Sequence, residues 1–200
     1  MFIGKVKIRG VKPIVFHKFN IEVITSLTKN KSGSAGNNPE EWKKSFYHED
    51  GKIYMPDMYV FSCLKNASVY TKAGRGSIQK TWISAVQINP TKIFLDRQMF
   101  EGWENIEPVF IEKYTDPSLP VYIDIRMVSN PNTKGKNVRY RVACSPDWTA
   151  EFEITIDDNL ISKAQAAKVI EDGGKLQGIA DLRTLGYGRY EVQYLDWQKA

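Results

Sequence analysis

The chain has 200 residues, of which 42% are hydrophobic and 26% are charged, a composition typical of globular proteins. It excludes collagen, long coiled coils and wholesale disorder, and no stretch reaches the ~18 apolar residues that a membrane-spanning helix needs. Because the first residues lack the apolar run of a signal peptide, we expect a soluble, cytoplasmic protein with no membrane partner. The formal net charge of +5 suits a polyanionic partner but does not identify one.

Charge is segregated along the chain. Residues 1–21 carry five cations and no acid, whereas residues 96–124 carry seven acids and only two basic residues. We therefore expect one basic and one acidic face on the folded protein.

Residues 2–9 alternate with a period of two, which predicts a strand with one buried face. Val6 and Ile8 point to one side, while Lys5, Lys7 and Arg9 point to the other. Two interpretations stay open. The cations either protect an edge strand against aggregation, or they form a basic sheet surface that follows the phosphates of a nucleic acid.

The first half of the chain continues with a polar loop over 28–39 and a hairpin over 46–54, which turns at Glu49-Asp50-Gly51. Asp57 is expected to cap a helix over 58–71, whose apolar residues recur at intervals of three and four. A glycine-bearing basic loop without acids follows, and its cations are Lys72, Arg75 and Lys80.

The second half reads mainly as strands. Residues 82–95 predict one or two short strands broken at Asn89-Pro90, and three prolines argue against a continuous element over 105–120. Further strands are expected over 121–128, 137–143, 150–156 and 190–195. The strand over 137–143 places Arg139 and Arg141 on one face. A helix capped by Asp157-Asp158-Asn159 should end in a left-handed glycine at Gly173-Gly174.

This order of elements predicts an α+β fold, and its simplest form is a ferredoxin-like β-α-β-β-α-β core with long loop and hairpin insertions over about 26–56 and 73–120. No internal repeat is visible, so we expect a single domain over 1–200. Cys63 and Cys144 are the only cysteines, and His17 and His48 are the only histidines. We therefore expect two buried thiols, no zinc site and no cofactor.

The most informative segment is Gly178-Ile-Ala-Asp-Leu-Arg-Thr-Leu-Gly-Tyr-Gly188. It has neither the order of a P-loop nor that of a dinucleotide fingerprint. Backbone amides together with Arg183 and Arg189 could hold phosphate, and Tyr187 could stack on a base. The alternative is a tight turn whose glycines only admit neighbouring side chains.

The segment is similar to the C-terminal glycine-rich loop of the RAMP superfamily, the CRISPR-associated RNA-binding proteins. That pattern is Gly-hydrophobic-Gly, five residues with a cation, then Gly-hydrophobic-Gly. Gly178-Ile-Ala180 departs from it at Ala180, and Gly186-Tyr-Gly188 matches it. Ile53-Tyr-Met-Pro56 before a helix also resembles the backbone-forming subunits of CRISPR effector complexes. Residues 82–130 carry no matching motif, which indicates a divergent member.

The resemblance implies an RRM-related core that binds single-stranded guide RNA, self-association along that RNA, and other effector subunits as partners. It also implies that the segments 26–52 and 73–81 are thumb and finger elements. The residues expected at the RNA are Lys5, Lys7, Arg9, Lys18, Lys72, Arg75, Lys80, Arg139, Arg141, Gly178, Arg183, Gly186, Tyr187, Gly188 and Arg189.

A non-catalytic binding subunit is the preferred interpretation, and three alternatives remain. The first is a metal-independent endoribonuclease of the same superfamily, in which His17 would act as a base; His17 could instead pack or contact a phosphate. The second is metal-dependent cleavage through Asp50 or Asp57, which also suit ordinary turn and helix-cap roles. The third is a phage or structural assembly protein, or a binder of single-stranded DNA.

Overall fold

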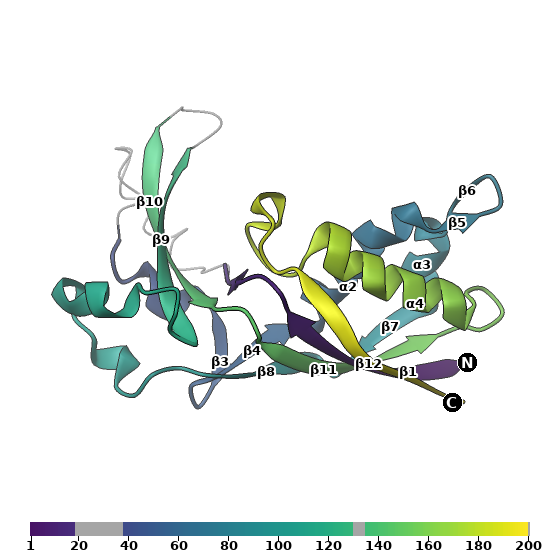
Figure 1. The fold of residues 1–200 in the computed structure, drawn as a ribbon, viewed down its shortest axis with the longest axis horizontal. Coiled ribbons are helices and arrows are strands. Elements are labelled where there is room, and N and C mark those ends of the chain that lie inside the picture. The colour runs from purple at the N-terminus through teal and green to yellow at the C-terminus, as the bar shows by residue number, and fades with distance from the viewer. Residues whose placement is uncertain (19–37, 130–134, 200) are drawn as a thin grey trace.

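The computed structural model describes residues 1–18, 38–129 and 135–199. Its largest unit is an antiparallel sheet in the order β12-β1-β11-β8-β4-β3, in which β7 also pairs with β11. Figure 1 shows the sheet along the length of an elongated molecule. Its strands are β1 (Phe2–Gly10), β3 (Tyr47–Glu49), β4 (Lys52–Pro56), β7 (Val86–Asn89), β8 (Lys92–Gln98), β11 (Thr149–Ile156) and β12 (Tyr190–Lys199).

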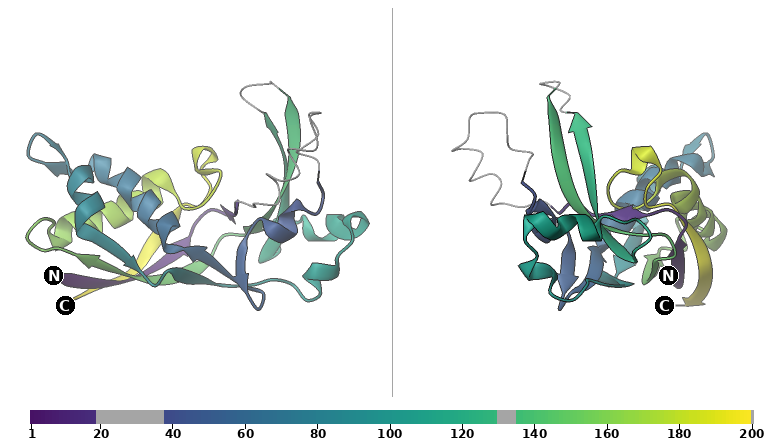
Figure 2. Two further views of the ribbon diagram at one scale, coloured as in Figure 1. Left: turned by 180° about the vertical axis from the view of Figure 1, so that it is seen from behind. Right: turned by 60° about the vertical axis from the view of Figure 1, so that its left-hand side comes forward.

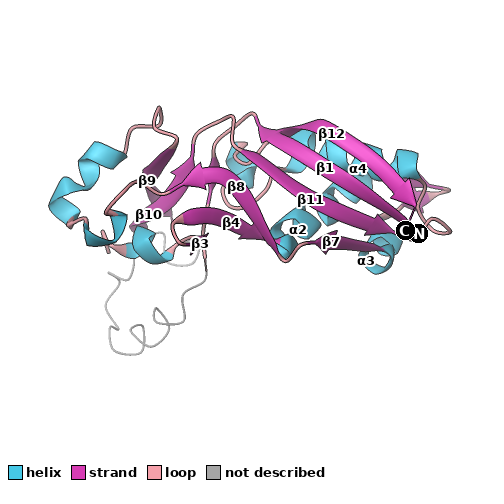
Figure 3. Cartoon of the chain, turned by 90° about the horizontal axis from the view of Figure 1, so that it is seen from below, coloured by secondary structure: helices cyan, strands magenta, loops and turns pink. Residues whose placement is uncertain are grey.

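Helices cover one face of this sheet and leave the other open, as Figure 3 shows from below. They are α2 (Asp57–Ala67), α3 (Gln79–Ala85) and α4 (Lys163–Asp172). The alternation predicted for the first strand is confirmed, since Val6 and Ile8 are buried beneath the helices and the cations between them are not. Strands and helices in these layers form a mixed α and β fold with a mainly antiparallel sheet.

β1 lies between β12 and β11, and β7 pairs with the other edge of β11. Every one of these pairings is antiparallel. In chain order α2 and α3 lie between β1 and β7, and α4 lies between β11 and β12. Beyond β7, β8 pairs with the same edge of β11, where Leu95 of β8 lies opposite Ala150 of β11. β8 also pairs with β4 and thereby joins the β3–β4 hairpin to the main sheet.

A second sheet of three strands stands at one end of the molecule. It consists of β2 (Ile14–Val15), β10 (Lys136–Cys144) and β9 (Val121–Ser129), with β9 at the edge. Figures 1 and 2 show the β9–β10 hairpin rising on the same side of the main sheet as the helices. One cluster of buried apolar side chains joins both sheets, so the hairpin is anchored in the core.

Shorter elements lie at the two ends of the long axis. The 3₁₀ helices η1 (Glu41–Lys44), η3 (Trp103–Asn105) and η4 (Pro108–Tyr114) pack near the base of the hairpin. At the opposite end, η2 (Ser68–Tyr70) leads into the small hairpin of β5 (Lys72–Ala73) and β6 (Gly76–Ser77). The acid-rich segment 96–124 thus lies toward the end with the β9–β10 hairpin and the acid-free loop of Lys72, Arg75 and Lys80 at the opposite end, whereas residues 1–18 run along the main sheet into the second sheet.

The predicted hairpin over 46–54 and the strand break at Asn89-Pro90 are confirmed. Two other predictions are wrong. Residues 82–85 are helical, because Trp82 is buried on the inner side of α3. The cap of α2 is Pro56, and Asp57 is already the first helical residue. The first long insertion is described only from residue 38 onward, so the polar loop over 28–39 lies largely outside the described residues.

The ends of α4 also differ from expectation. Ser162 is its cap, with Gln165 completing a capping box, whereas Asp157 accepts from the backbone of Asn159 in the preceding turn. Gly173 is right-handed at φ −55°, and the chain continues into the π-helix η5 (Gly173–Gln177). Gly173 and Gly174 are required by contact with Tyr190, since an added Cβ would meet that residue within 2.6 Å.

Both cysteines are free and buried, which confirms the expectation of two buried thiols. Burial raises the pKa of Cys63 to about 12, so this thiol stays protonated at neutral pH. Within the described residues, no helix is long and apolar enough to cross a membrane.

Shortening single side chains of α2 measures how much the stability of the fold depends on the packing of the helices against the sheet. Leu64 is completely buried, so we expect Leu64→Ala to lower the free energy of unfolding by about 2–5 kcal/mol. Met58 in the same helix is 63% exposed, and Met58→Ala should stay within about 0.5 kcal/mol of the parent. Urea denaturation of both variants checks this, and equal losses would contradict the layer order described here.

Candidate nucleic-acid interface

The glycine-rich loop adopts the unusual backbone that its sequence suggests. Gly178, Gly186 and Gly188 have φ values of +81°, +84° and +67°. Ala180 stands where the RAMP pattern has a glycine, and it too is left-handed, with φ +67°. This position therefore has the backbone conformation that favours glycine although its residue is alanine.

Two of these glycines serve close packing within the loop. A Cβ on Gly188 would lie 1.9 Å from the carbonyl oxygen of Ile179, and one on Gly178 would lie 2.4 Å from that of Tyr187. The Gly188 amide donates to Pro13, 2.7 Å away, which ties the loop to the start of β2. At these two positions the tight-turn interpretation describes the structure, whereas Gly186 faces open space.

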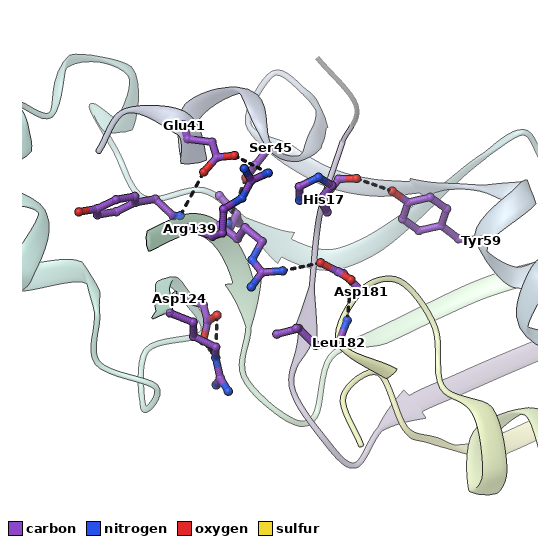
Figure 4. A network of polar contacts seen from close by, with 12 residues as sticks. His17, Glu41, Ser45, Tyr59, Asp124, Arg139, Asp181 and Leu182 are labelled. Atoms are coloured by element: carbon purple, nitrogen blue, oxygen red, sulfur yellow. Dashed lines mark hydrogen bonds and ion pairs between the residues drawn. The ribbon is translucent and has the colours of Figure 1, made fainter. Parts of the chain in front are cut away.

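Two contacts join the loop to the β9–β10 hairpin. Arg141 Nη1 lies 2.5 Å from Asp181 Oδ2, and Arg126 donates to the hydroxyl of Tyr187 while its guanidinium lies over the Tyr187 ring. In Figure 4 a dashed line that ends at Asp181 marks the first of these contacts. Arg141 is almost completely buried, and its Nε and Nη2 groups have no hydrogen-bond partner among the described residues.

The predicted cation Arg139 lies beside this contact but is also paired. Its guanidinium is 2.8 Å from Glu41 of η1, which also accepts weakly from the backbone of Tyr140 (Figure 4). Arg139 and Arg141 thus share a face of the hairpin as predicted, but both are neutralised by a carboxylate.

A cavity of about 330 Å³ opens where the loop approaches α2. His17 lines it together with Tyr59, whose hydroxyl donates to the His17 carbonyl over 3.4 Å. Asp181 and Arg183 line the opposite side. Partial burial, followed by the nearby Arg139 cation, holds the pKa of His17 below its usual value, so its imidazole is neutral at neutral pH.

The cations of β1 lie elsewhere, on the face of the sheet opposite the helices and the loop: Lys5, Lys7 and Arg9. Lys7 is 2.9 Å from Glu151, and Arg9 is 3.3 Å from Asp147 and 3.4 Å from Glu191. Glu153 and Asp196 flank Lys5 in register. The structure therefore does not bring the basic strand and the glycine-rich loop onto one surface, and neighbouring acids offset its charge.

The other predicted cations are dispersed. Lys18 is exposed beside His17, and its ammonium lies over the ring of Tyr47. Lys72, Arg75 and Lys80 are exposed at the far end of the long axis, on and next to the β5–β6 hairpin. Arg183 and Arg189 remain with the loop, and the backbone carbonyl of Arg189 accepts from Val11 and Lys12.

The acids and the second histidine weighed for catalysis lie apart from this cavity. Asp50 is in the β3–β4 turn with φ +49°, and Asp57 begins α2. His48 is only partly exposed, because its ring packs edge-on against Trp103. Among the described residues, no three His, Cys, Asp or Glu side chains lie close enough to hold a metal ion.

Sequence reasoning missed the residues that organise the site: Glu41, Tyr59, Asp124, Arg126 and Asp181. A signal was present for two of them. Asp124 and Arg126 alternate within the predicted strand, which puts both on one face. Asp124 is the buried partner of Arg126, with its oxygens 2.8 and 2.9 Å from Nε.

Comparison with known proteins identifies the fold. No family model and no curated protein matches this sequence. Among solved structures, it resembles a chain of the "Cryo-EM structure of the Type III-B Cmr-beta bound to cognate target RNA", with a TM-score of 0.51 and 13% identity. The match covers 99% of this chain and 61% of that chain, so this protein spans about three fifths of its neighbour's length.

Substitutions of the two left-handed glycines of the Gly-Tyr-Gly segment separate packing from backbone strain. In both alanine variants the positive φ strains the backbone, but only in Gly188→Ala does the added Cβ also collide with the Ile179 backbone. We expect the free energy of unfolding of Gly188→Ala to be about 1–3 kcal/mol lower than that of Gly186→Ala. Thermal or urea melts of the pair measure the difference, and equal stabilities would mean that the loop is not packed as described.

Proposed function

We propose that this protein is a divergent member of the RAMP superfamily and a single-stranded RNA-binding subunit of a CRISPR-type ribonucleoprotein complex. The single observation that carries the proposal is the fold likeness, which extends over 99% of the chain, to a chain from a type III-B complex bound to target RNA. The glycine-rich loop supports it independently, because the RAMP motif and the left-handed backbone coincide at four positions.

The strand pairings support a ferredoxin-like core within the proposed single domain. Strands in the order β12-β1-β11-β7, with α2 and α4 as the two connections on one face, correspond to a β-α-β-β-α-β unit. In this proposal β3–β4, the β5–β6 hairpin and the β9–β10 hairpin are the insertions, and RNA passes between the last of these and the helices.

Unpaired cations define the surface that would contact phosphates. Among the described residues, Arg183 lines the cavity, Lys18 follows its lining residue His17, and Lys12 and Arg189 adjoin the loop; none of these four forms an ion pair with another described residue. Ionic contacts of this kind bind RNA without reading its sequence and weaken as salt rises. The paired cations of β1 contribute less in this proposal, and Lys72, Arg75 and Lys80 lie at the end where a neighbouring copy or another effector subunit would bind.

The direct test removes the two arginines of the loop. We expect the Arg183→Ala, Arg189→Ala double variant to bind single-stranded RNA at least tenfold more weakly and with a shallower salt dependence, since each charge-assisted contact contributes about 1 kcal/mol or more. Fluorescence anisotropy at two salt concentrations measures both quantities.

The matched control is the Lys113→Ala, Lys163→Ala double variant. It removes the same charge from two lysines that lie over the rings of Phe110 and Phe2. Equal weakening by both double variants would mean that net charge, and not the loop, is responsible. Unchanged binding in the folded loop variant would count against the assignment.

The cavity beside His17 favours one second candidate, metal-independent cleavage of guide RNA. Neutral His17 suits a base that accepts the ribose 2′-hydroxyl proton, and Arg183 across the cavity suits the charge that develops on phosphate. Tyr59 cannot act as an anionic base, since burial raises its pKa far above neutral.

This candidate predicts cleavage of a repeat-hairpin RNA in the presence of EDTA. The rate of cleavage should rise with pH and become constant at a pH below the usual titration range of histidine. This is because the pKa of His17 is lowered, and the neutral imidazole that acts as the base predominates above that pKa. His17→Ala should abolish the activity while RNA binding persists. Cleavage that survives this substitution would remove His17 from the mechanism, and the absence of cleavage by the parent would leave the binding subunit as the function.

A further inference from the structure

A second and larger cavity, of about 530 Å³, lies along the free edge of β9. Arg126 and Tyr187 line it on one side, Ile111 and Pro117 on another, and Pro13 closes it toward the loop. It does not share a lining residue with the cavity beside His17, so two separate hollows adjoin the glycine-rich loop.

The guanidinium of Arg126 is held in a fixed orientation at this cavity by Asp124 and Tyr187. Its Nε is bound by Asp124 at 2.8 Å, and its guanidinium carbon lies 4.7 Å from the centre of the Tyr187 ring. These contacts fix the plane of the guanidinium, while 35% of the side chain stays exposed. A guanidinium that lies over an aromatic ring and is held by a carboxylate and a hydroxyl is a preorganised surface for a further planar group.

The charge of the lining selects against a phosphate. Among the described residues, Arg126 is the one cation that lines the cavity, and the buried carboxylate of Asp124 already neutralises it. Glu112 adds a negative charge, and the remaining walls are mainly apolar. A site with apolar walls, few polar groups and no net positive charge fits a neutral, planar ligand with hydrogen-bonding edges.

We propose that this cavity holds one nucleobase of the bound strand, stacked on the guanidinium of Arg126. The inference rests on the proposed function, because it assumes that RNA follows the cations on the other side of the loop. The phosphates then stay at those cations, and a base enters the cavity beside β9. No residue of the β9 strand was among the RNA contacts expected from sequence.

The test fills the cavity and leaves the Arg126 contacts intact. Ile125 lies on the face of β9 opposite Arg126 and lines the same cavity, so Ile125→Trp reduces the space open to a base. Met127, two residues along β9 and 68% exposed, does not line it, and Met127→Trp is the matched control. Thr115→Trp fills the same space from the segment that follows η4 and serves if Ile125→Trp does not fold.

The probes are a 20-nucleotide single-stranded RNA and an abasic ribose-phosphate strand of equal length. We expect the parent and Met127→Trp to prefer the RNA, and Ile125→Trp to lose RNA affinity on the order of tenfold while its affinity for the abasic strand is unchanged. An Ile125→Trp variant with the full preference for RNA overturns the inference and leaves RNA binding intact. Failure of the parent to bind either strand overturns the proposed function, and the inference with it.

Discussion

The ion pair between buried Arg141 and Asp181 is the contact on which the arrangement of the site depends. It joins two segments far apart in the chain, the β9–β10 hairpin and the glycine-rich loop. A buried arginine that loses its carboxylate partner becomes a poorly compensated charge, so the pair disfavours separating these segments. The Nε and Nη2 groups of Arg141 have no hydrogen-bond partner among the described residues, so the bond from Nη1 to Asp181 is the side-chain hydrogen bond that holds this guanidinium.

With this contact in place, the glycine-rich loop separates two cavities of different chemistry, one beside α2 and one beside β9. On the α2 side, Arg183, which forms no ion pair among the described residues, lines a cavity with a neutral histidine, and this lining suits phosphate and ribose. On the β9 side, Arg126 is paired with Asp124 and lies over the Tyr187 ring, which suits a planar group. The arginines on the two sides of the loop therefore differ in chemistry, because Asp124 offsets the charge of Arg126, whereas Asp181 at the other cavity is paired with Arg141.

Local patterns predicted well whatever depends on a single element. The alternation of β1, the turn at Asp50-Gly51 and the breaks at glycine and proline follow from backbone rules that act over a few residues. What failed depends on tertiary contacts. Residues 82–85 look like a strand but form a helix around buried Trp82, and Gly173 is required by contact with Tyr190 and not by a left-handed turn. The pairing of Arg141 with Asp181 spans 40 residues and leaves no local trace.

The glycine-rich loop shows what a motif predicts and what it does not. A motif records which backbone conformations are needed, and Ala180 is left-handed at the position where the pattern has a glycine. It does not record what the side chains contact. Tyr187, expected to be free for a base, already lies under Arg126, so a base in this region meets the guanidinium first. The aromatic residue then acts by fixing the plane of the arginine, and the arginine is the surface that a ligand would contact.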